Sequence, residues 1–204
     1  MLKIENLHKS YRKEKVLHGL NLHINSGEIV SIVGSSGSGK TTLLRLVSGL
    51  EIPESGKIVI KENIVNSANA FTPPEKRDCS LVFQDYALFP NLSMIDNIYF
   101  GKGSKKNKER VEDLIKITNI EKILNKFPHE CSGGEQQRVS LVRSMAINPE
   151  LILMDEPLSN LDYHLKSKIS KLICKIIKKF KTTAVIVTHD IMDAIKISQK
   201  VEQS

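Results

Sequence analysis

The fold is decided by the stretch Gly34-Ser35-Ser36-Gly37-Ser38-Gly39-Lys40-Thr41, which matches the pattern G-x-x-x-x-G-K-[ST]. The apolar run Ile29–Val33 precedes it, and leucine and valine residues recur with helical spacing between 43 and 47. Glycines let successive backbone N–H groups turn inward around a phosphate, and the start of a helix adds partial positive charge. Strand, loop and helix together predict a phosphate-binding loop, a setting that a chance Gly/Ser-rich turn would lack.

The side chains of this loop predict an ATP site that uses Mg²⁺. Lys40 is expected to reach the β- and γ-phosphates, and the Thr41 hydroxyl is expected to bind the metal ion. The residues predicted to bind ATP here are Gly34, Ser35, Ser36, Gly37, Ser38, Gly39, Lys40, Thr41 and Thr42.

A second apolar run, Leu151–Met154, ends in two acidic residues. Asp155 is expected to hold Mg²⁺, and Glu156 stands one residue further, where it can polarise a water molecule aimed at the γ-phosphate. Two acids before Pro157 can also be a turn that starts a helix. The phosphate-binding loop in the same chain favours the catalytic interpretation.

The stretch 131–138, Cys-Ser-Gly-Gly-Glu-Gln-Gln-Arg, resembles the signature of the ABC ATPases, which is usually written L-S-G-G-Q. The resemblance covers almost the whole chain, with the motifs in the family's order. It implies that two subunits meet head to tail when ATP is bound, and that each signature closes over ATP held by the other subunit. The residues expected to contact ATP in this way are Ser132, Gly133, Gly134 and Glu135, from the start of a helix.

Two positions depart from the usual signature. Cys131 replaces leucine, which should remove packing and leave the phosphate contacts, and Glu135 replaces glutamine, which brings a charge that can tune dimer closure. Taken alone, Ser-Gly-Gly can equally be a simple helix cap.

The resemblance also gives roles to positions that mean little alone. Tyr11 resembles the aromatic residue that stacks on adenine, with Val16 beside it, although a tyrosine there is otherwise a hairpin surface residue. Gln84 resembles the glutamine that touches Mg²⁺ or water and senses the membrane partner. The segment from Ser159 to Asp162 resembles the loop that crosses the dimer interface. His189 resembles the histidine that contacts the γ-phosphate and shares the catalytic work, whereas a histidine ending a strand is usually structural.

The pattern of the whole chain predicts an α/β fold: a P-loop NTPase core with a mostly parallel sheet, an N-terminal antiparallel β subdomain and an inserted helical subdomain. The antiparallel part is expected at about 1–30 and 56–70, and the helical insertion at about 85–147, within one ABC ATPase domain spanning 1–204. Strands are predicted at 2–7, 21–24, 29–33, 80–83, 151–154 and 183–188 and a hairpin at 56–66, with helices at 94–100, 108–117, 134–147, 163–180 and 191–197. We expect no C-terminal regulatory domain and no room for further strands after the last helix.

Composition limits the class of protein. The net charge is +7, with 40% apolar and 26% charged residues, an ordinary globular balance. Cys79, Cys131 and Cys174 show no disulfide or zinc spacing, and no apolar run is long enough to span a membrane, so we expect a cytosolic protein. Lysines are dense at 102–108 and 166–181. They fit a solvated helix face as well as nucleic acid, anionic lipid or a phosphate ligand.

The sequence could belong to one of three kinds of ABC protein. A non-transport ATPase acting on nucleic acid or ribosomes is the alternative to a transporter subunit, but about 90 residues separate Thr41 from Ser132 and they carry no sustained heptad. Translation-factor types carry two cassettes, whereas this chain has one. A regulatory protein without turnover conflicts with Glu156 and His189. The sequence therefore favours transport, with no nucleic-acid partner expected.

Among transporters, the segments 73–78 and 82–90 look most like uptake systems for polyamines, ferric iron, sulfate, molybdate or thiamine. The stretch after Gln84, with Tyr86, Leu88 and Phe89, is apolar as a docking surface for a membrane permease should be, although it can also be internal packing. This resemblance implies a permease partner, indirectly a substrate-binding protein, and a peripheral place on the cytoplasmic face of the membrane. Ferric iron or a polyamine is the expected cargo.

Overall fold

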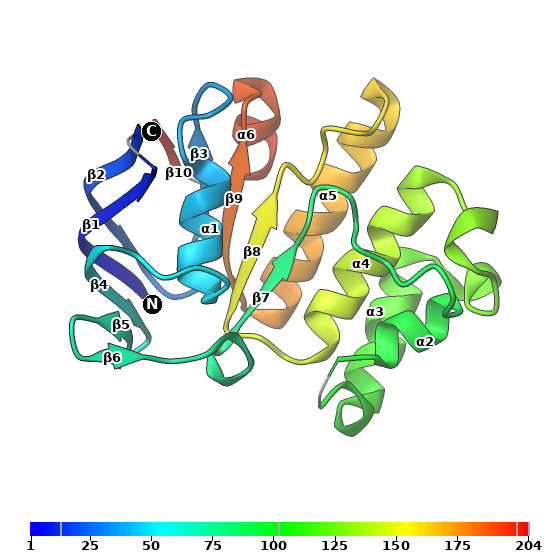
Figure 1. The fold of residues 1–204 in the computed structure, drawn as a ribbon. Coiled ribbons are helices and arrows are strands. Elements are labelled where there is room, and N and C mark those ends of the chain that lie inside the picture. The colour runs from blue at the N-terminus through cyan, green and yellow to red at the C-terminus, as the bar shows by residue number, and fades with distance from the viewer. Residues whose placement is uncertain (13, 102, 199, 204) are drawn as a thin grey trace.

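The computed structural model describes residues 1–12, 14–101, 103–198 and 200–203, and shows two sheets with helices packed against them (Figure 1). The antiparallel sheet has the order β2-β1-β4-β5-β6 and the parallel sheet the order β10-β3-β9-β8-β7. The strands are β1 (Leu2–Tyr11), β2 (Glu14–Ile24), β3 (Ile29–Val33), β4 (Ser55–Ile60), β5 (Asn63–Ser67), β6 (Ala70–Phe71), β7 (Cys79–Val82), β8 (Leu151–Asp155), β9 (Thr183–Thr188) and β10 (Lys200–Gln203). The helices are α1 (Lys40–Ser48), α2 (Met94–Tyr99), α3 (Lys108–Thr118), α4 (Gly133–Ala146), α5 (Tyr163–Phe180) and α6 (Ile191–Ile197).

The parallel sheet is buried on both faces, which is why its strands are continuous apolar runs. Along β8, Ile152 and Met154 pack into a core shared with α2 to α6, whereas Leu151 and Leu153 pack into a core shared with α1 and the antiparallel sheet. Side chains that alternate along a strand thus serve two layers. The predicted α/β architecture with a mostly parallel sheet is confirmed.

The N-terminal hairpin differs from its prediction in length. β1 and β2 pair from Leu2↔Ile24 to Tyr11↔Glu14, far beyond the predicted strands at 2–7 and 21–24. The added residues are mostly polar, only Leu17 of the described ones among them is buried, and the register shifts along the pair, so no clean alternation marks them. Ile29 and Val30 lie within the predicted antiparallel part, but they begin the parallel strand β3.

The expectation that no strand follows the last helix is wrong. Residues 200–203 form β10, which pairs in parallel with β3 from Lys200↔Val30 to Gln203↔Val33. This strand lies at the edge of the sheet, and its sequence, Lys-Val-Glu-Gln, is polar. Lys200 and Val201 are exposed and Glu202 is half-buried, so the apolar pattern that reveals a buried strand is missing.

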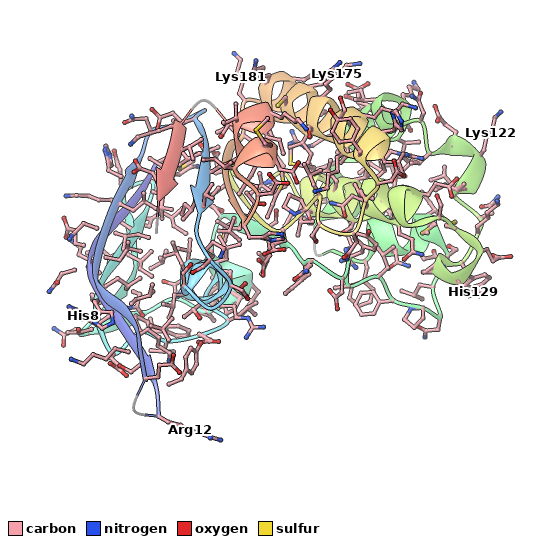
Figure 2. All side chains as sticks on the ribbon, turned by 90° about the horizontal axis from the view of Figure 1, so that it is seen from above. His8, Arg12, Lys122, His129, Lys175 and Lys181 are labelled. Atoms are coloured by element: carbon pink, nitrogen blue, oxygen red, sulfur yellow. The ribbon has the colours of Figure 1, made fainter. Side chains whose placement is uncertain are left out.

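Most lysines of α5 are exposed, as a solvated helix face predicts, but the amine of Lys166 pairs with Asp193 at 2.7 Å. Lys175 and Lys181 point away from the molecule in Figure 2, and Lys179 pairs with Asp113 at 2.8 Å. Lys102, which belongs to the other lysine-rich stretch, lies outside the described residues. In the described part of the chain, no helix has both the length and the apolar character that a membrane span requires.

One buried cation ties α1 to the antiparallel sheet. Arg77 is 5% exposed, and its guanidinium donates to the carbonyls of Leu46 and Val47 at the end of α1, at 2.8 and 2.7 Å. It also donates to the carbonyls of Thr72 and Val65. Burial lowers the pKa of Arg77, but these carbonyls, and the negative end of the helix dipole, offset much of the cost of burying the charge.

Replacing this cation is expected to destabilise the fold. Arg77→Met should lower the free energy of unfolding by about 3 kcal/mol, because the carbonyls at the end of α1 lose their donors inside the protein. Urea unfolding measures the change, with Arg12→Met as the control, since Arg12 is exposed and points outward (Figure 2). A loss no larger than that of the control would show that water satisfies these carbonyls.

Candidate nucleotide-binding site

The predicted catalytic residues come from neighbouring strands and meet at one edge of the parallel sheet. The phosphate-binding loop follows β3, Asp155 ends β8, Glu156 follows it, and His189 directly follows β9. These strands are adjacent in the order β3-β9-β8 and run in parallel, so their carboxyl ends lie together. Ligands of open α/β sheets bind at this edge.

The phosphate-binding loop is wound as its glycines predict. Gly37 and Gly39 have φ values of 84° and 90°, a conformation that favours glycine. A Cβ on Gly39 would also lie 2.7 Å from a methyl group of Val16, which places Val16 against the loop. The Lys40 amine turns back over the loop and donates to the carbonyls of Gly34 and Ser35, at 2.8 and 2.6 Å. A phosphate in this loop would find both backbone N–H groups and a cation.

Thr41 and Asp155 form an oxygen pair suited to magnesium. The Thr41 hydroxyl donates to the Asp155 carboxylate at 3.1 Å, and Asp155 is 8% exposed. Burial, together with the charge of Glu156, raises the pKa of Asp155, so a cation here would relieve an unfavourable charge. Among the described residues no group of three or more His, Cys, Asp or Glu could form an all-protein metal site. The hydroxyl of Thr41 and the carboxylate of Asp155 suit Mg²⁺, which usually takes one or two protein ligands with phosphates and water.

Glu156 and His189 contact each other at the mouth of the site. The Glu156 carboxylate lies 3.0 Å from Nδ1 of His189. The Glu156 backbone has a φ of 44°, rare for a residue other than glycine, and its N–H donates to the carbonyl of Val187 in β9 at 2.9 Å. Strained backbones of this kind often occur where a side chain is held for function. The carboxylate is therefore fixed between the ends of β8 and β9, with an imidazole beside it.

Gln84 and the predicted interface loop contact each other within the chain. The Gln84 amide lies 3.5 Å from the Ser159 hydroxyl, which donates to the carbonyl of Glu156 at 3.0 Å. Asp162 caps α5 by accepting from the N–H groups of His164 and Leu165. The role of Gln84 as a metal ligand, and those of Ser159 and Asp162 across an interface, stay predictions.

Tyr11 is the last residue of β1 and lies near α1. Its hydroxyl donates to the Glu51 carboxylate and lies 3.5 Å from the hydroxyl of Thr42. Burial and this carboxylate raise the pKa of Tyr11. The ring is 41% exposed and has the Lys9 amine 5.2 Å from its centroid. Stacking of Tyr11 on adenine stays a prediction, and Glu51 is a contact that no sequence signal indicated.

The signature lies apart from the phosphate-binding loop of its own chain. It starts α4, which packs on the opposite face of the parallel sheet from α1. Ser132 bonds to Glu135 within its own turn, and a Cβ on Gly134 would lie 3.4 Å from Leu165 of α5. The role of Ser132, Gly133, Gly134 and Glu135 at the ATP of a second subunit stays a prediction.

Two side chains that sequence reasoning missed hold the segment after Gln84. Asn97 is fully buried, and its amide accepts from the N–H of Phe89 and donates to the same residue's carbonyl, at 2.8 and 3.1 Å. Arg143 of α4 donates to the carbonyls of Tyr86 and Ala87, at 2.9 and 2.7 Å. The segment is thus bound to the signature helix. An asparagine and an arginine at helix positions gave no sign of this function.

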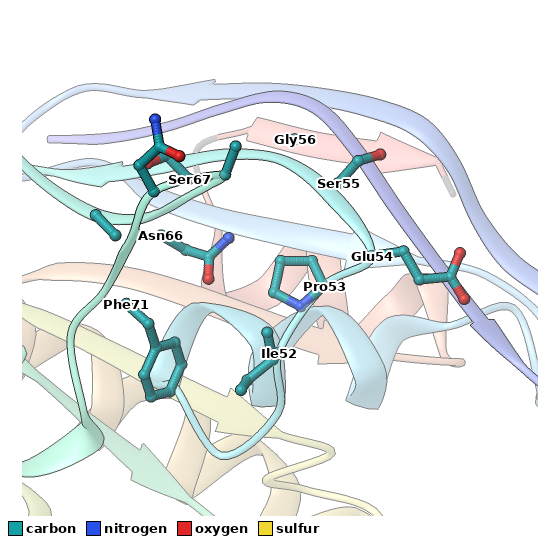
Figure 3. Close-up of a pocket in the computed structure, with 11 residues that line it drawn as sticks. Ile52, Pro53, Glu54, Ser55, Gly56, Asn66, Ser67 and Phe71 are labelled. Atoms are coloured by element: carbon teal, nitrogen blue, oxygen red, sulfur yellow. The ribbon is translucent and has the colours of Figure 1, made fainter.

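A pocket elsewhere on the chain is separate from this site. It lies between the segments 52–56 and 66–71, beside the antiparallel sheet (Figure 3). A bulge between β4 and β5, where the register shifts after the pair Ile58↔Asn66, accompanies the buried Asn66 that lines it. None of the predicted site residues is among the described residues that line this pocket.

The chain resembles known proteins along nearly all of its length. The family model described as ABC transporter matches residues 17–159. A ferric-iron import ATP-binding protein of Haemophilus influenzae is 39% identical over 98% of this chain and 58% of its own length. A spermidine/putrescine import ATP-binding protein of Legionella pneumophila is 40% identical over 98% of this chain and 56% of its own length.

A solved structure, a dimeric ATP-binding cassette in a post-hydrolysis state with ADP and phosphate, is 32% identical with a TM-score of 0.83. The match covers 100% of this chain and 94% of that one. The chain thus spans nearly all of the solved cassette, but less than two thirds of the length of these curated relatives.

Proposed function

Because this chain belongs to the ABC transporter family, we propose that it is the ATP-hydrolysing subunit of a transporter that imports a small ion or polar solute. The observation that carries the proposal is the meeting of Thr41, Asp155, Glu156 and His189 at one edge of the sheet beside the phosphate-binding loop. A family member without turnover would not need a carboxylate held against a histidine at this position.

The proposed reaction assigns each residue one task. The backbone N–H groups of residues 34–41 and the Lys40 amine hold the β- and γ-phosphates. Thr41 and Asp155 would hold Mg²⁺, which neutralises phosphate charge when bound. Glu156 accepts a proton from the water whose oxygen attacks the γ-phosphorus, and the bond to ADP breaks. His189 keeps the Glu156 carboxylate in place from 3.0 Å and reaches toward the γ-phosphate.

The active form is proposed to be a head-to-tail dimer of two copies that closes on ATP. Ser132 and the amides of Gly133 and Gly134 would donate to the γ-phosphate bound by the partner, because they stand at the start of α4. Ser159 and Asp162 would cross the interface. The dimeric solved cassette, at 32% identity, supports this assembly.

The cargo proposed is ferric iron or a polyamine, delivered by a substrate-binding protein to the permease. Relatives of nearly equal identity are import ATP-binding proteins for Fe(3+) ions, spermidine/putrescine and glucose. The proposed location is the cytoplasmic face of the membrane, beside a permease. The ATPase does not touch the cargo, so the permease and its binding protein decide the choice.

The permease is proposed to dock on the segment after Gln84. Phe89 is 37% exposed and Phe100 is 60% exposed, and their rings lie 4.2 Å apart between centroids. Exposed aromatic pairs of this kind are typical of interaction sites. Because Asn97 and Arg143 bind this segment to the helical subdomain, a permease that moves Phe89 would also move α4.

This proposal predicts that one substitution can remove the permease-stimulated ATPase activity and leave the basal ATPase activity. Phe89→Asp should abolish stimulation of the ATPase by the permease and leave the basal rate intact, because a charge replaces the apolar contact outside the nucleotide site. Turnover is measured with and without the reconstituted permease. Ile64→Asp is the control, since Ile64 is 46% exposed on the antiparallel sheet. If Phe89→Asp still responds to the permease, the permease binds to another surface. If Phe89→Asp does not fold, Phe89 is part of the core.

A further inference from the structure

The Glu135 carboxylate accepts hydrogen bonds from both the backbone N–H and the side-chain hydroxyl of Ser132. One oxygen accepts from the Ser132 N–H at 2.8 Å and from the Ser132 hydroxyl at 2.7 Å. These two hydrogen bonds lower the pKa of Glu135 below its ordinary value, so the group is an anion at neutral pH. A serine hydroxyl has one proton to donate. While Ser132 donates to Glu135, it cannot donate to a phosphate.

A second anion at this turn would compete with Glu135. The γ-phosphate of the partner subunit's ATP is proposed to approach the same hydroxyl, and it would arrive beside a carboxylate of like charge. The glutamine of the usual signature carries no charge, and its side-chain oxygen accepts the same hydrogen bonds. Glu135 therefore adds repulsion at the point where the dimer closes, and keeps the local cap of α4.

The structure also holds a second partner for the displaced carboxylate. Arg138 lies three residues further along α4, a spacing that places two side chains next to each other on a helix. Its Nε atom is buried and has no hydrogen-bond partner within the described residues. A buried donor without an acceptor is unfavourable, so a carboxylate that turns from Ser132 to Arg138 would satisfy it.

We propose that Glu135 is a positioning residue with two partners: it holds Ser132 in the open subunit and turns to Arg138 when the dimer closes on ATP. This inference rests on the proposed function, because it requires a signature that meets ATP across a dimer. In this chain the switch sets a higher threshold for closure than the usual signature would. ATP must displace an internal anion before the shared site forms.

The test measures dimer affinity in a chain that cannot turn over ATP. In a Glu156→Gln background at saturating MgATP, sedimentation gives the dimer dissociation constant with and without Glu135→Gln. We expect Glu135→Gln to tighten the dimer about tenfold, equal to about 1.4 kcal/mol. Glu135→Asp keeps the charge and should not tighten it. The gain should shrink as salt rises, because salt screens the repulsion between carboxylate and phosphate.

A double-mutant cycle tests the second partner. Arg138→Gln should weaken the ATP-bound dimer when Glu135 is present, and should have much less effect combined with Glu135→Gln, because the displaced carboxylate is then absent. Equal effects in both backgrounds would remove Arg138 from the switch. A dimer that is not tightened by Glu135→Gln, or that Glu135→Asp tightens equally, would overturn the inference alone. Failure of the Glu156→Gln chain to dimerise on MgATP would overturn the proposed function as well.

Discussion

Glu156→Gln is expected to bind ATP as the unchanged chain does and to lose turnover by about 10² or more, the scale of a lost general base. The amide has the shape of the carboxylate but cannot accept the proton of the attacking water. The backbone N–H of Glu156 still donates to Val187, so the loop should keep its conformation. The variant should therefore stop after binding and accumulate as an ATP-bound dimer.

Phosphate release and gel filtration with MgATP check both parts of this prediction. Glu150→Gln is the matched control, because Glu150 is an exposed acid paired with Lys61 at 2.7 Å and has no place in the site. That control should hydrolyse ATP at the normal rate. Unchanged turnover in Glu156→Gln would remove Glu156 from the role of base.

The parts of the site that could be predicted from sequence share one property: each follows a buried strand. A strand that is buried on both faces of a parallel sheet is a continuous apolar run, which can be recognised in the sequence. The polar residue that ends the run can be recognised too. Gly34–Thr41, Asp155 and His189 stand after such runs, and the structure brings them to one edge. Parallel pairing of adjacent strands then sets their proximity without further information.

What could not be predicted depends on contacts between distant residues. Arg77 reads as one charged residue in a loop, yet it binds carbonyls of residues about 30 positions earlier in the chain. Asn97 and Arg143 likewise act on a loop whose path a sequence does not show. The edge strand β10 carries no apolar pattern, because the side chains of Lys200, Val201 and Glu202 are not buried.

Glu135 is an intermediate case. The sequence shows Glu135 where the usual signature has glutamine, and it predicts that this charge can tune dimer closure. The capping of Ser132 by its carboxylate follows from the spacing of three residues at a helix start. The unpartnered Nε of Arg138 does not, because burial of that atom depends on the packing of α4.

The second large effect concerns a site shared between two chains. Lys40→Ala should remove phosphate binding from its own loop, and Ser132→Arg should block the signature against the partner's ATP. Each variant alone therefore spoils both sites of its dimer. In a mixed dimer, one site joins the intact Lys40 of one chain to the intact Ser132 of the other, and only the second site is lost.

The mixture of Lys40→Ala and Ser132→Arg is the most direct test that two copies of this chain form an ATPase. Each variant alone should show almost no phosphate release. An equal mixture should recover at most one of two sites in each mixed dimer. If the two variants pair at random, the mixture should show on the order of a quarter of the unchanged activity. Activity in either variant alone, or mixed dimers that form without any recovery, would contradict a site completed by the partner.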